Sequence, residues 1–353
     1  MISAKMQNEN TAISFPSSNV HSLSALNLMP SSILHPPSSF VLVTGGAGFI
    51  GSHLVERLLN EGKSIVVIDD FSTGSRENLS AVQSNPRLRI IPSKICDCAE
   101  LPELAANAEF IFHLAATVGV DLVVKSALHV LEASFNETQI LLRAAAQNST
   151  PLLLTSTSEV YGKSAKLEFS EDDDLLIGPP GQSRWSYACS KLTDEFLALA
   201  YAREKNLPVI IARLFNTVGP RQTGRYGMVL PRFIASANKW EPLKVFGDGK
   251  QSRCFGLVHD VVEALVRLQN CPAARGEIFN IGGTEEISIL DLARRVVETL
   301  ASKSRIETIP YDQAYAPGFD DMRRRKPLVE KLERFVQFKP QTPLREIIRL
   351  TAE

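Results

Sequence analysis

The chain has 353 residues, of which 44% are hydrophobic and 22% are charged, and its formal net charge is −1. This composition suits a globular protein with a sizeable core, built as one large domain or as two domains in close contact. A charge so near zero gives no general attraction for nucleic acid or anionic membranes, and no apolar run approaches the ~20 residues of a bilayer span, so we expect neither as a partner.

The first 38 residues are rich in serine, proline and asparagine and contain no arginine. They lack the basic start and apolar centre of a secretory signal, so we expect residues 1–38 to be a disordered tail. Five scattered cysteines indicate reduced thiols rather than a disulfide framework, which favours a cytoplasmic protein. No group of histidines or cysteines accompanies the Cys96/Cys98 pair, and we assign no metal.

Residues 41–51 form an apolar stretch that breaks into spaced glycines and then resumes as a helix. Gly45, Gly48 and Gly51 have the spacing that allows a tight turn, a close approach of backbone N–H groups to a pyrophosphate, and packing of the helix on the strand. The positive end of the helix then faces the anion. The pattern predicts a dinucleotide phosphate site, to which we also assign Phe49 and Ile50.

A second apolar run at residues 65–68 predicts a buried strand that ends at Asp69. A carboxylate about 20 residues after the first glycine accepts hydrogen bonds from the adenosine ribose and repels a 2′-phosphate. We therefore predict NAD, rather than NADP, as the cofactor, with Asp69 and the adjoining Asp70 in its site.

Short apolar runs alternate with longer helical patterns from residue 40 onward, which is typical of a parallel sheet with crossover helices. We predict an α/β fold: a Rossmann-type doubly wound parallel sheet over residues 39–218, then a smaller mixed α/β lobe over 219–353 that binds substrate, with some segments returning to the first domain. The lobe should cover the carboxyl edge of the sheet, where open α/β sheets bind ligands. The predicted strands are 40–44, 64–69, 88–92, 109–113, 151–156 and 208–213, and the predicted helices include 49–60, 125–147 and 185–204.

Tyr187 and Lys191 are four residues apart in a predicted helix, so they lie on one face of it. A nearby ammonium favours the phenolate, and we expect it to lower the pKa of Tyr187 from its usual value of about 10. The pair then forms an acid–base couple. Hydroxyl residues at 155–158 end the fifth predicted strand and should face the same edge of the sheet. The acidic run at 171–174 is most simply a solvated loop.

These elements occur together and in order, and the chain resembles the extended short-chain dehydrogenase/reductase superfamily, specifically its NAD-dependent nucleotide-sugar epimerases, dehydratases and decarboxylases. The resemblance covers residues 40 to about 350. Besides the glycine loop and the Tyr-x-x-x-Lys helix, it is carried by the segments at 68–70, 113–116, 155–162, 213–221 and 247–253. One departure is Lys94, which stands where many relatives have an aspartate that contacts adenine.

The resemblance implies a role for each matching residue. Tyr187 removes the proton from the sugar 4-hydroxyl, Thr157 hydrogen-bonds the same oxygen, and Lys191 holds the nicotinamide ribose. Relatives dimerise through two helices per subunit, so we expect a homodimer. The resemblance adds Ala115 to the cofactor site, assigns Asn216, Arg221 and Arg253 to the substrate pyrophosphate, and makes Arg184 a candidate for a uronic carboxylate.

Oxidation at the sugar 4-position leaves several outcomes open, and neighbouring side chains decide among them. Ser158 replaces the aspartate usual in 4,6-dehydratases, which demotes dehydration. Ser158, Glu159 and Arg325 resemble the set in UDP-glucuronate decarboxylases, whereas residues 116–120 and 228–233 are more like 4-epimerases. We expect 4-epimerisation of a UDP-hexose or UDP-hexuronate, with decarboxylation as the alternative. A regulator that only senses NAD is disfavoured, because such proteins typically lack the Tyr/Lys pair.

Overall fold

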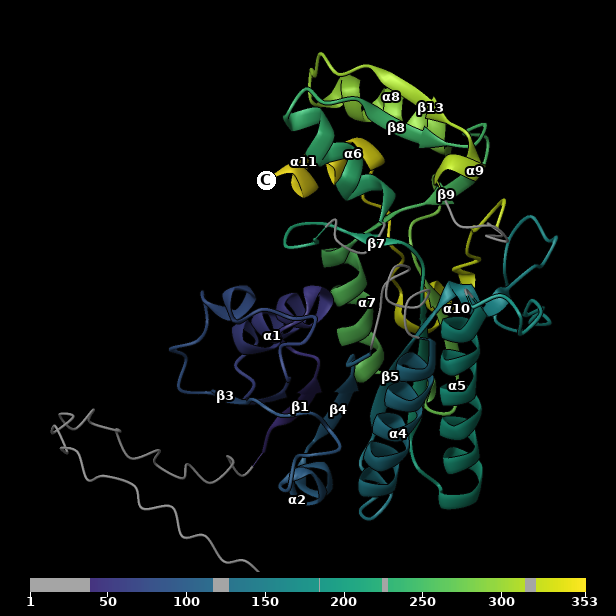
Figure 1. Ribbon diagram of the computed structural model, residues 1–353. Coiled ribbons are helices and arrows are strands. Elements are labelled where there is room, and N and C mark those ends of the chain that lie inside the picture. The colour runs from purple at the N-terminus through teal and green to yellow at the C-terminus, as the bar shows by residue number, and fades with distance from the viewer. Residues whose placement is uncertain (1–38, 117–126, 184, 224–227, 315–321) are drawn as a thin grey trace, which may run out of the picture. The chain divides into compact units, whose positions relative to one another are not determined.

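The central sheet of the protein is parallel throughout and has the strand order β11-β6-β5-β4-β1-β2-β3 (Figure 1). The computed structural model describes residues 39–116, 127–183, 185–223, 228–314 and 322–353. The six predicted strands are found to within one residue at each end. The sheet comprises β1 (Val41–Thr44), β2 (Ile65–Ile68), β3 (Leu88–Ile91), β4 (Phe110–His113), β5 (Leu152–Thr157), β6 (Val209–Leu214) and β11 (Ile278–Ile281).

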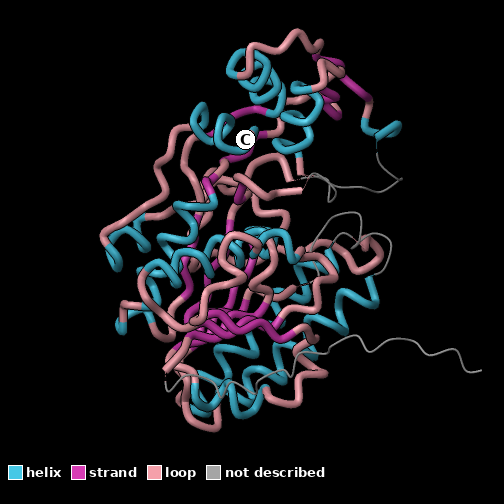
Figure 2. Tube along the Cα trace, turned by 90° about the vertical axis from the view of Figure 1, so that its left-hand side faces the viewer, coloured by secondary structure: helices cyan, strands magenta, loops and turns pink. Residues whose placement is uncertain are grey.

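Helices cover both faces of this sheet, and Figure 2 shows the strands between two helical layers. Val41 and Val43 face one layer and Leu42 faces the other, because successive side chains of a strand alternate between its faces. Strands covered on both faces are mostly apolar, as β2 is throughout and as β1 and β4 are up to their last residues, Thr44 and His113. The first layer holds α1 (Phe49–Asn60), α7 (Val258–Gln269) and α10 (Glu330–Val336), and the second holds α2 (Leu101–Asn107), α4 (Ala127–Ala145) and α5 (Trp185–Lys205).

A smaller lobe has its own apolar core, formed by residues such as Phe233, Val245, Leu292 and Ile347. It lies at the top of Figure 1. Its strands pair as β8 with β13, in parallel, and as β9 with β12, antiparallel. The lobe comprises α6 (Val229–Asn238), β8 (Leu243–Phe246), β9 (Ser252–Cys254), β12 (Glu286–Ser288), α8 (Ile289–Thr299), β13 (Ile306–Ile309), α9 (Tyr311–Ala314) and α11 (Leu344–Ala352).

Several segments after residue 218 return to the sheet, since α7, β11 and α10 all pack in it or on it. The short pair β7 (Thr217–Val218) and β10 (Gly256–Leu257) links the sheet to the lobe. The described residues from 39 to 353 form one compact unit. The Rossmann-type fold is as predicted, the boundary at residue 218 stays a prediction, and the expected tail at 1–38 lies outside the described residues.

Short 3₁₀ helices complete the fold at η1 (Arg76–Leu79), η2 (Ser158–Tyr161) and η4 (Pro272–Ala274).

Helix α1 has the bounds that its sequence predicts. It begins directly after Gly48 and ends before Gly62, whose φ of +84° lies in the left-handed region that favours glycine. Across the described parts of the chain, no helix combines the length and the apolar character that crossing a membrane requires.

Candidate active site

The glycine loop between β1 and α1 is packed so closely that two of its positions exclude a side chain. A Cβ at Gly45, where φ is +72°, would lie 2.6 Å from the backbone nitrogen of Ala115. A Cβ at Gly51 would lie 2.1 Å from the carbonyl oxygen of Gly45. The N-terminus of α1, at Phe49 and Ile50, is therefore held against the carboxyl ends of β1 and β4, as a phosphate site requires.

Asp69, directly after β2, joins this loop through its side chain. Its Oδ2 accepts a hydrogen bond from the backbone N–H of Ala47 and its Oδ1 from that of Phe71, both at 2.8 Å. Burial raises the pKa of Asp69, and these two hydrogen bonds oppose that shift. Each oxygen keeps a second lone pair, so a closely packed glycine turn beside a buried acceptor fits a dinucleotide. Asp70 is exposed and accepts a hydrogen bond from the Ser72 N–H.

Thr157 and Tyr187, which are 30 positions apart in the sequence, meet in the structure. Thr157 ends β5, and its hydroxyl accepts a hydrogen bond from the backbone N–H of Glu159 at 3.3 Å, so it caps η2. The same hydroxyl is hydrogen-bonded to the phenol of Tyr187 near the start of α5. A phenol and a second hydroxyl thus converge at the carboxyl edge of the sheet.

The expected effect of Lys191 on the pKa of Tyr187 is not found in the structure. The pKa of Tyr187 lies above its usual value because the phenol is buried and because Glu159 and Asp194 are near, while its hydrogen bond with Thr157 acts in the opposite direction. The Lys191 ammonium is instead bonded to Asp194, at 3.1 Å. The prediction of a lowered pKa was wrong because spacing along a helix shows which side chains share a face but not which other charges lie beside them.

Glu159 and Arg325 form an ion pair next to Thr157. Arg325 Nη1 donates to Glu159 Oε1 at 3.3 Å, and the side chains are only 13% and 17% exposed. The residues are 166 positions apart, so the fold brings the C-terminal segment to the catalytic strand. Ser158, between Thr157 and Glu159, is buried.

The candidate substrate residues after β6 lie in two places. Asn216 Nδ2 donates to the Cys254 carbonyl at 2.9 Å, and Arg253 is buried in β9, where its Nη1 donates to the carbonyl of Ser252. Arg221 instead reaches α1, where its Nη2 donates to Glu56 at 2.7 Å. The predicted carboxylate partner Arg184 lies outside the described residues.

A buried polar network, which the sequence pattern did not predict, joins the strands and the helix that carry the site residues. Arg213 donates to Glu195 on α5 at 2.8 Å and to the Tyr161 hydroxyl at 3.0 Å, and the Ser156 hydroxyl donates to the same glutamate. Tyr161 in turn donates to Asn280 at 2.7 Å. The network ties β5, α5, β6 and β11 together. Lys191 and Glu195 have a spacing of four, which was the one available sign that α5 has a second charged residue on its buried side.

The acidic run at 171–174 is not simply a solvated loop, which corrects the sequence interpretation. Glu171 is only 8% exposed, and its carboxylate accepts a hydrogen bond from the backbone N–H of Asn280 at 2.8 Å. Burial raises its pKa. Asp173 forms an ion pair with Lys166. Part of the run is therefore structural, because two of its carboxylates bond elsewhere in the fold.

A pocket of about 460 Å³ opens between the loop after η2, the start of α5 and the segment from Met322. Its lining includes Lys163, Lys166, Arg323 and Arg324 beside Trp185. Such a wall favours anionic ligands. Among the residues described, no cluster of three or more His, Cys, Asp or Glu side chains is arranged to hold a metal ion.

Residues 41–282 match the NAD dependent epimerase/dehydratase family. The chain belongs to this family. The matched range contains the glycine loop, Asp69, Thr157, Tyr187 and Lys191. The family is NAD-dependent, which agrees with the dinucleotide site formed by the glycine loop and Asp69. NAD is the cofactor, as the sequence predicted.

Proteins similar to this chain include decarboxylases and a 4-epimerase of UDP-linked sugars. The chain is 40% identical to a UDP-N-acetyl-alpha-D-glucosaminuronate decarboxylase of Bacillus cytotoxicus, over 88% of this chain and 96% of that protein. It is 37% identical to UDP-glucuronic acid decarboxylase 2 of Arabidopsis thaliana, over 87% of this chain and 66% of that protein. Among solved structures, the UDP-glucuronic acid 4-epimerase of Bacillus cereus in complex with UDP-glucuronic acid and NAD is 28% identical, with a TM-score of 0.79 over 88% of this chain and 97% of that chain. These comparisons support NAD-dependent modification of a nucleotide sugar.

Proposed function

We propose that this protein decarboxylates a UDP-linked hexuronate, which reverses the order of preference that the sequence suggested. The observation that carries the proposal is the ion pair between Arg325 and Glu159, placed beside the hydrogen-bonded Thr157 and Tyr187. A cation at this position can bind the carboxylate of a uronic acid while the two hydroxyls hold its 4-oxygen. The decarboxylases among the relatives, at 40% and 37% identity, support the same choice.

NAD, which the glycine loop and Asp69 would hold, would supply reversible hydride transfer at carbon 4 of the sugar. Tyr187 takes the proton of the 4-hydroxyl as that bond to hydrogen breaks, and Thr157 holds the oxygen in place. The raised pKa of Tyr187 keeps the phenol protonated near neutral pH, so its surroundings must change before it acts as a base.

The resulting 4-ketone lies β to the carboxylate, and this relation makes loss of carbon dioxide chemically accessible. The bond between carbons 5 and 6 breaks, and its electron pair is delocalised to the 4-oxygen, where Tyr187 and Thr157 can stabilise the charge. Carbon 5 then takes a proton, and reduction at carbon 4 gives a UDP-pentose. Arg325 positions the departing carboxylate, and Glu159 fixes the guanidinium through their 3.3 Å contact.

The diphosphate of the proposed substrate is an anion, so its binding site should contain hydrogen-bond donors and positive charges. Asn216 and Arg253 lie at the end of β6 and in β9, near the link between sheet and lobe. The basic pocket beside α5 agrees with a substrate that bears a diphosphate and a carboxylate. Arg221 is assigned to the same role more weakly, since it is already paired with Glu56.

The second candidate is 4-epimerisation, the function that the sequence favoured. It is supported by the similarity to the Bacillus cereus 4-epimerase, whose structure contains UDP-glucuronic acid. An epimerase uses the same oxidation but returns hydride to the opposite face of the ketone, so the carboxylate stays. The sugar products of the two reactions differ in mass by one carbon dioxide, so one assay distinguishes them.

The test is product analysis by mass spectrometry and NMR after incubation with NAD and UDP-glucuronate, and separately with UDP-N-acetylglucosaminuronate. We expect a product lighter by one carbon dioxide, with a pentose spin system. A product of unchanged mass with inverted carbon 4 would replace decarboxylation by epimerisation, and absence of any conversion of both compounds would contradict the assigned substrate class. Conversion of only one identifies the sugar.

We also propose a homodimer formed by α4 and α5. Leu128, Leu131 and Phe135 are 69%, 39% and 37% exposed, and their spacing of three and four places them on one face of α4. Phe196 on the adjacent α5 is 63% exposed. An apolar face across two packed helices suits a second copy of the chain, in keeping with the family resemblance.

A further inference from the structure

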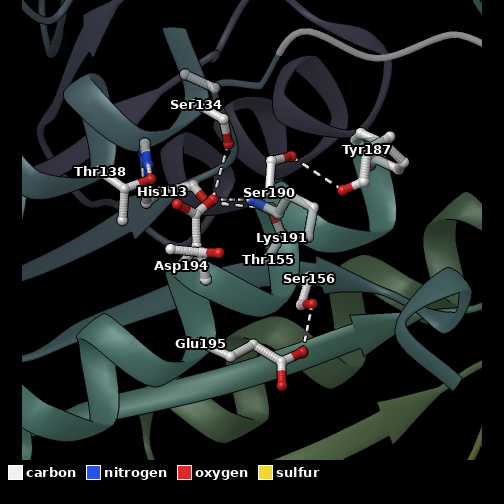
Figure 3. Close-up of polar contacts among 12 residues, drawn as sticks. His113, Ser134, Thr138, Thr155, Ser156, Tyr187, Ser190, Lys191, Asp194 and Glu195 are labelled. Carbon is white, nitrogen blue, oxygen red and sulfur yellow. Dashed lines mark hydrogen bonds and ion pairs between the residues drawn. The ribbon is translucent and has the colours of Figure 1, made fainter. Parts of the chain in front are cut away.

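Lys191, the partner expected for Tyr187, forms a buried ion pair with Asp194 of the same helix. Its side chain is 3% exposed and that of Asp194 is 0% exposed, and Lys191 Nζ lies 3.1 Å from Asp194 Oδ2. Figure 3 shows this contact at the centre of the site, between α4 and α5. A buried ammonium needs a compensating charge, and among the described residues Asp194 provides the contact that does so.

Asp194 is fixed from the neighbouring helix as well. The Ser134 hydroxyl of α4 donates to Asp194 Oδ2 at 2.9 Å, so one carboxylate oxygen accepts from both helices (Figure 3). The other oxygen, Oδ1, is buried and has no hydrogen-bond partner among the described residues. Such an arrangement is costly to keep for packing alone, which points to a function for the carboxylate itself.

The next residue, Glu195, makes the distinction clear. It bonds to Arg213 and Ser156, on the side of the sheet, and belongs to the supporting network. Asp194 bonds to Lys191 and Ser134 instead. Two consecutive acids on α5 therefore serve two different buried cations, and Asp194 serves the one in the catalytic pair.

We propose that Asp194 is a positioning residue for the Tyr187/Lys191 pair: its carboxylate holds the Lys191 ammonium against α4 and neutralises its charge toward Tyr187. This inference rests on the proposed role of Tyr187 as the base. The Asp194 charge also disfavours the phenolate of Tyr187, so its removal lets Tyr187 act as a base at lower pH. Its removal also releases the ammonium from the position in which it meets the cofactor.

Other charged groups face this pair from each neighbouring element. They are His113 of β4, Glu137 of α4 and Glu159 of η2. The pKa of His113 is lowered to about 3 by burial, so the ring is neutral at working pH. Burial, with Asp70 next, raises the pKa of Glu137 to about 7, so Glu137 also titrates in the range of the test.

The test compares Asp194→Asn with wild type in two measurements. The first is the pH dependence of NADH formation in a single turnover with UDP-glucuronate, and we expect its acid limb to move to lower pH by about one unit. The second is NAD affinity by calorimetry without substrate, where we expect a loss of about tenfold because Lys191 is no longer held. Glu137→Gln is measured in parallel to separate its titration from the shift.

Matched variants distinguish this role of Asp194 from a general loss of structure. Asp194→Glu retains the charge and should return the acid limb toward that of wild type, while Glu204→Gln makes the same charge change on an exposed position of α5 and should alter neither readout. Ser134→Ala, which leaves the carboxylate in place, covers the case in which Asp194→Asn does not fold and should weaken NAD binding in the same direction. A folded Asp194→Asn with a wild-type acid limb and wild-type NAD affinity would overturn the proposal. If wild type converts no UDP-sugar, the proposed function fails, but the calorimetry still decides the part played by Asp194.

Discussion

The hydroxyl of Thr157 both caps η2 and contacts the phenol of Tyr187. It accepts from the backbone N–H of Glu159 at 3.3 Å and is hydrogen-bonded to Tyr187. The cap fixes the side chain where β5 ends, so the hydroxyl is preorganised before substrate arrives. The predicted meeting of Thr157 and Tyr187 is thus a property of the fold, whereas the chemical role of both residues stays a proposal.

His113 gives a test of how the buried side chains respond to pH. Its ring nitrogens bond to Thr44 at 2.7 Å and Thr138 at 3.1 Å, and burial lowers its pKa from 6.5 to about 3. The unfolded chain binds a proton as the pH falls through 6.5 and the folded protein does not, so the stability from this residue is complete above 6.5 and lost as the pH falls toward 3. Between pH 7 and pH 5 the loss is about 2 kcal/mol.

Urea unfolding of wild type and His113→Gln at both pH values checks this expectation. The variant should lose less stability on acidification than wild type, by about that amount. His259→Gln, at an exposed position, is the control and should behave as wild type. Equal acid sensitivity of wild type and His113→Gln would show that His113 is not a buried neutral histidine.

Sequence patterns predicted the residues of the site better than their contacts. Local spacing and the family resemblance indicated Thr157, Tyr187 and Lys191. Neither could show that Asp194 takes the Lys191 ammonium, because a pairing between buried charges depends on which helix packs alongside, here α4 with Ser134. Glu171 was misjudged for the same reason, since its partner Asn280 is 109 positions away.

Helix α5 carries several of the residues that we propose for the reaction. It carries Tyr187 and the buried Lys191, Asp194 and Glu195, so a single helix sets their relative positions. Its bounds followed from the sequence to within one residue, as did those of α1 and of the six predicted strands. The short strands of the lobe were not predicted, and neither was β11, in which Asn280 interrupts the apolar run.

The exposed apolar face of α4 and α5 predicts a dimer that a single charge disrupts. We expect wild type to sediment as a dimer at micromolar concentration and Phe196→Arg as a monomer, because a buried unpaired guanidinium opposes association. Trp240→Arg, at a 66% exposed aromatic of the lobe, is the control and should remain dimeric. Sedimentation of wild type as a monomer would contradict the proposal.

Over the whole chain, the site depends on segments that are far apart in sequence and meet at the carboxyl edge of one sheet. The glycine loop and Asp69 come from its first two strands, Thr157 from β5, and Arg325 from the C-terminal segment. The lobe is connected through β7 and β10, beside Asn216. This division fits a cofactor held by the sheet and a substrate held mainly by the lobe, with the reacting carbon between Tyr187 and Arg325.

The central claim is that this arrangement oxidises a UDP-hexuronate and then expels its carboxylate. The most direct measurement follows carbon-13 placed at carbon 6 of UDP-glucuronate, using wild type and Tyr187→Phe, each first shown by calorimetry to bind NAD. We expect wild type to release the label as carbon dioxide and Tyr187→Phe to release none, since the lost phenol acts in proton transfer rather than in docking. Retention of the label in a hexuronate product of wild type, or full release by Tyr187→Phe, would contradict the account.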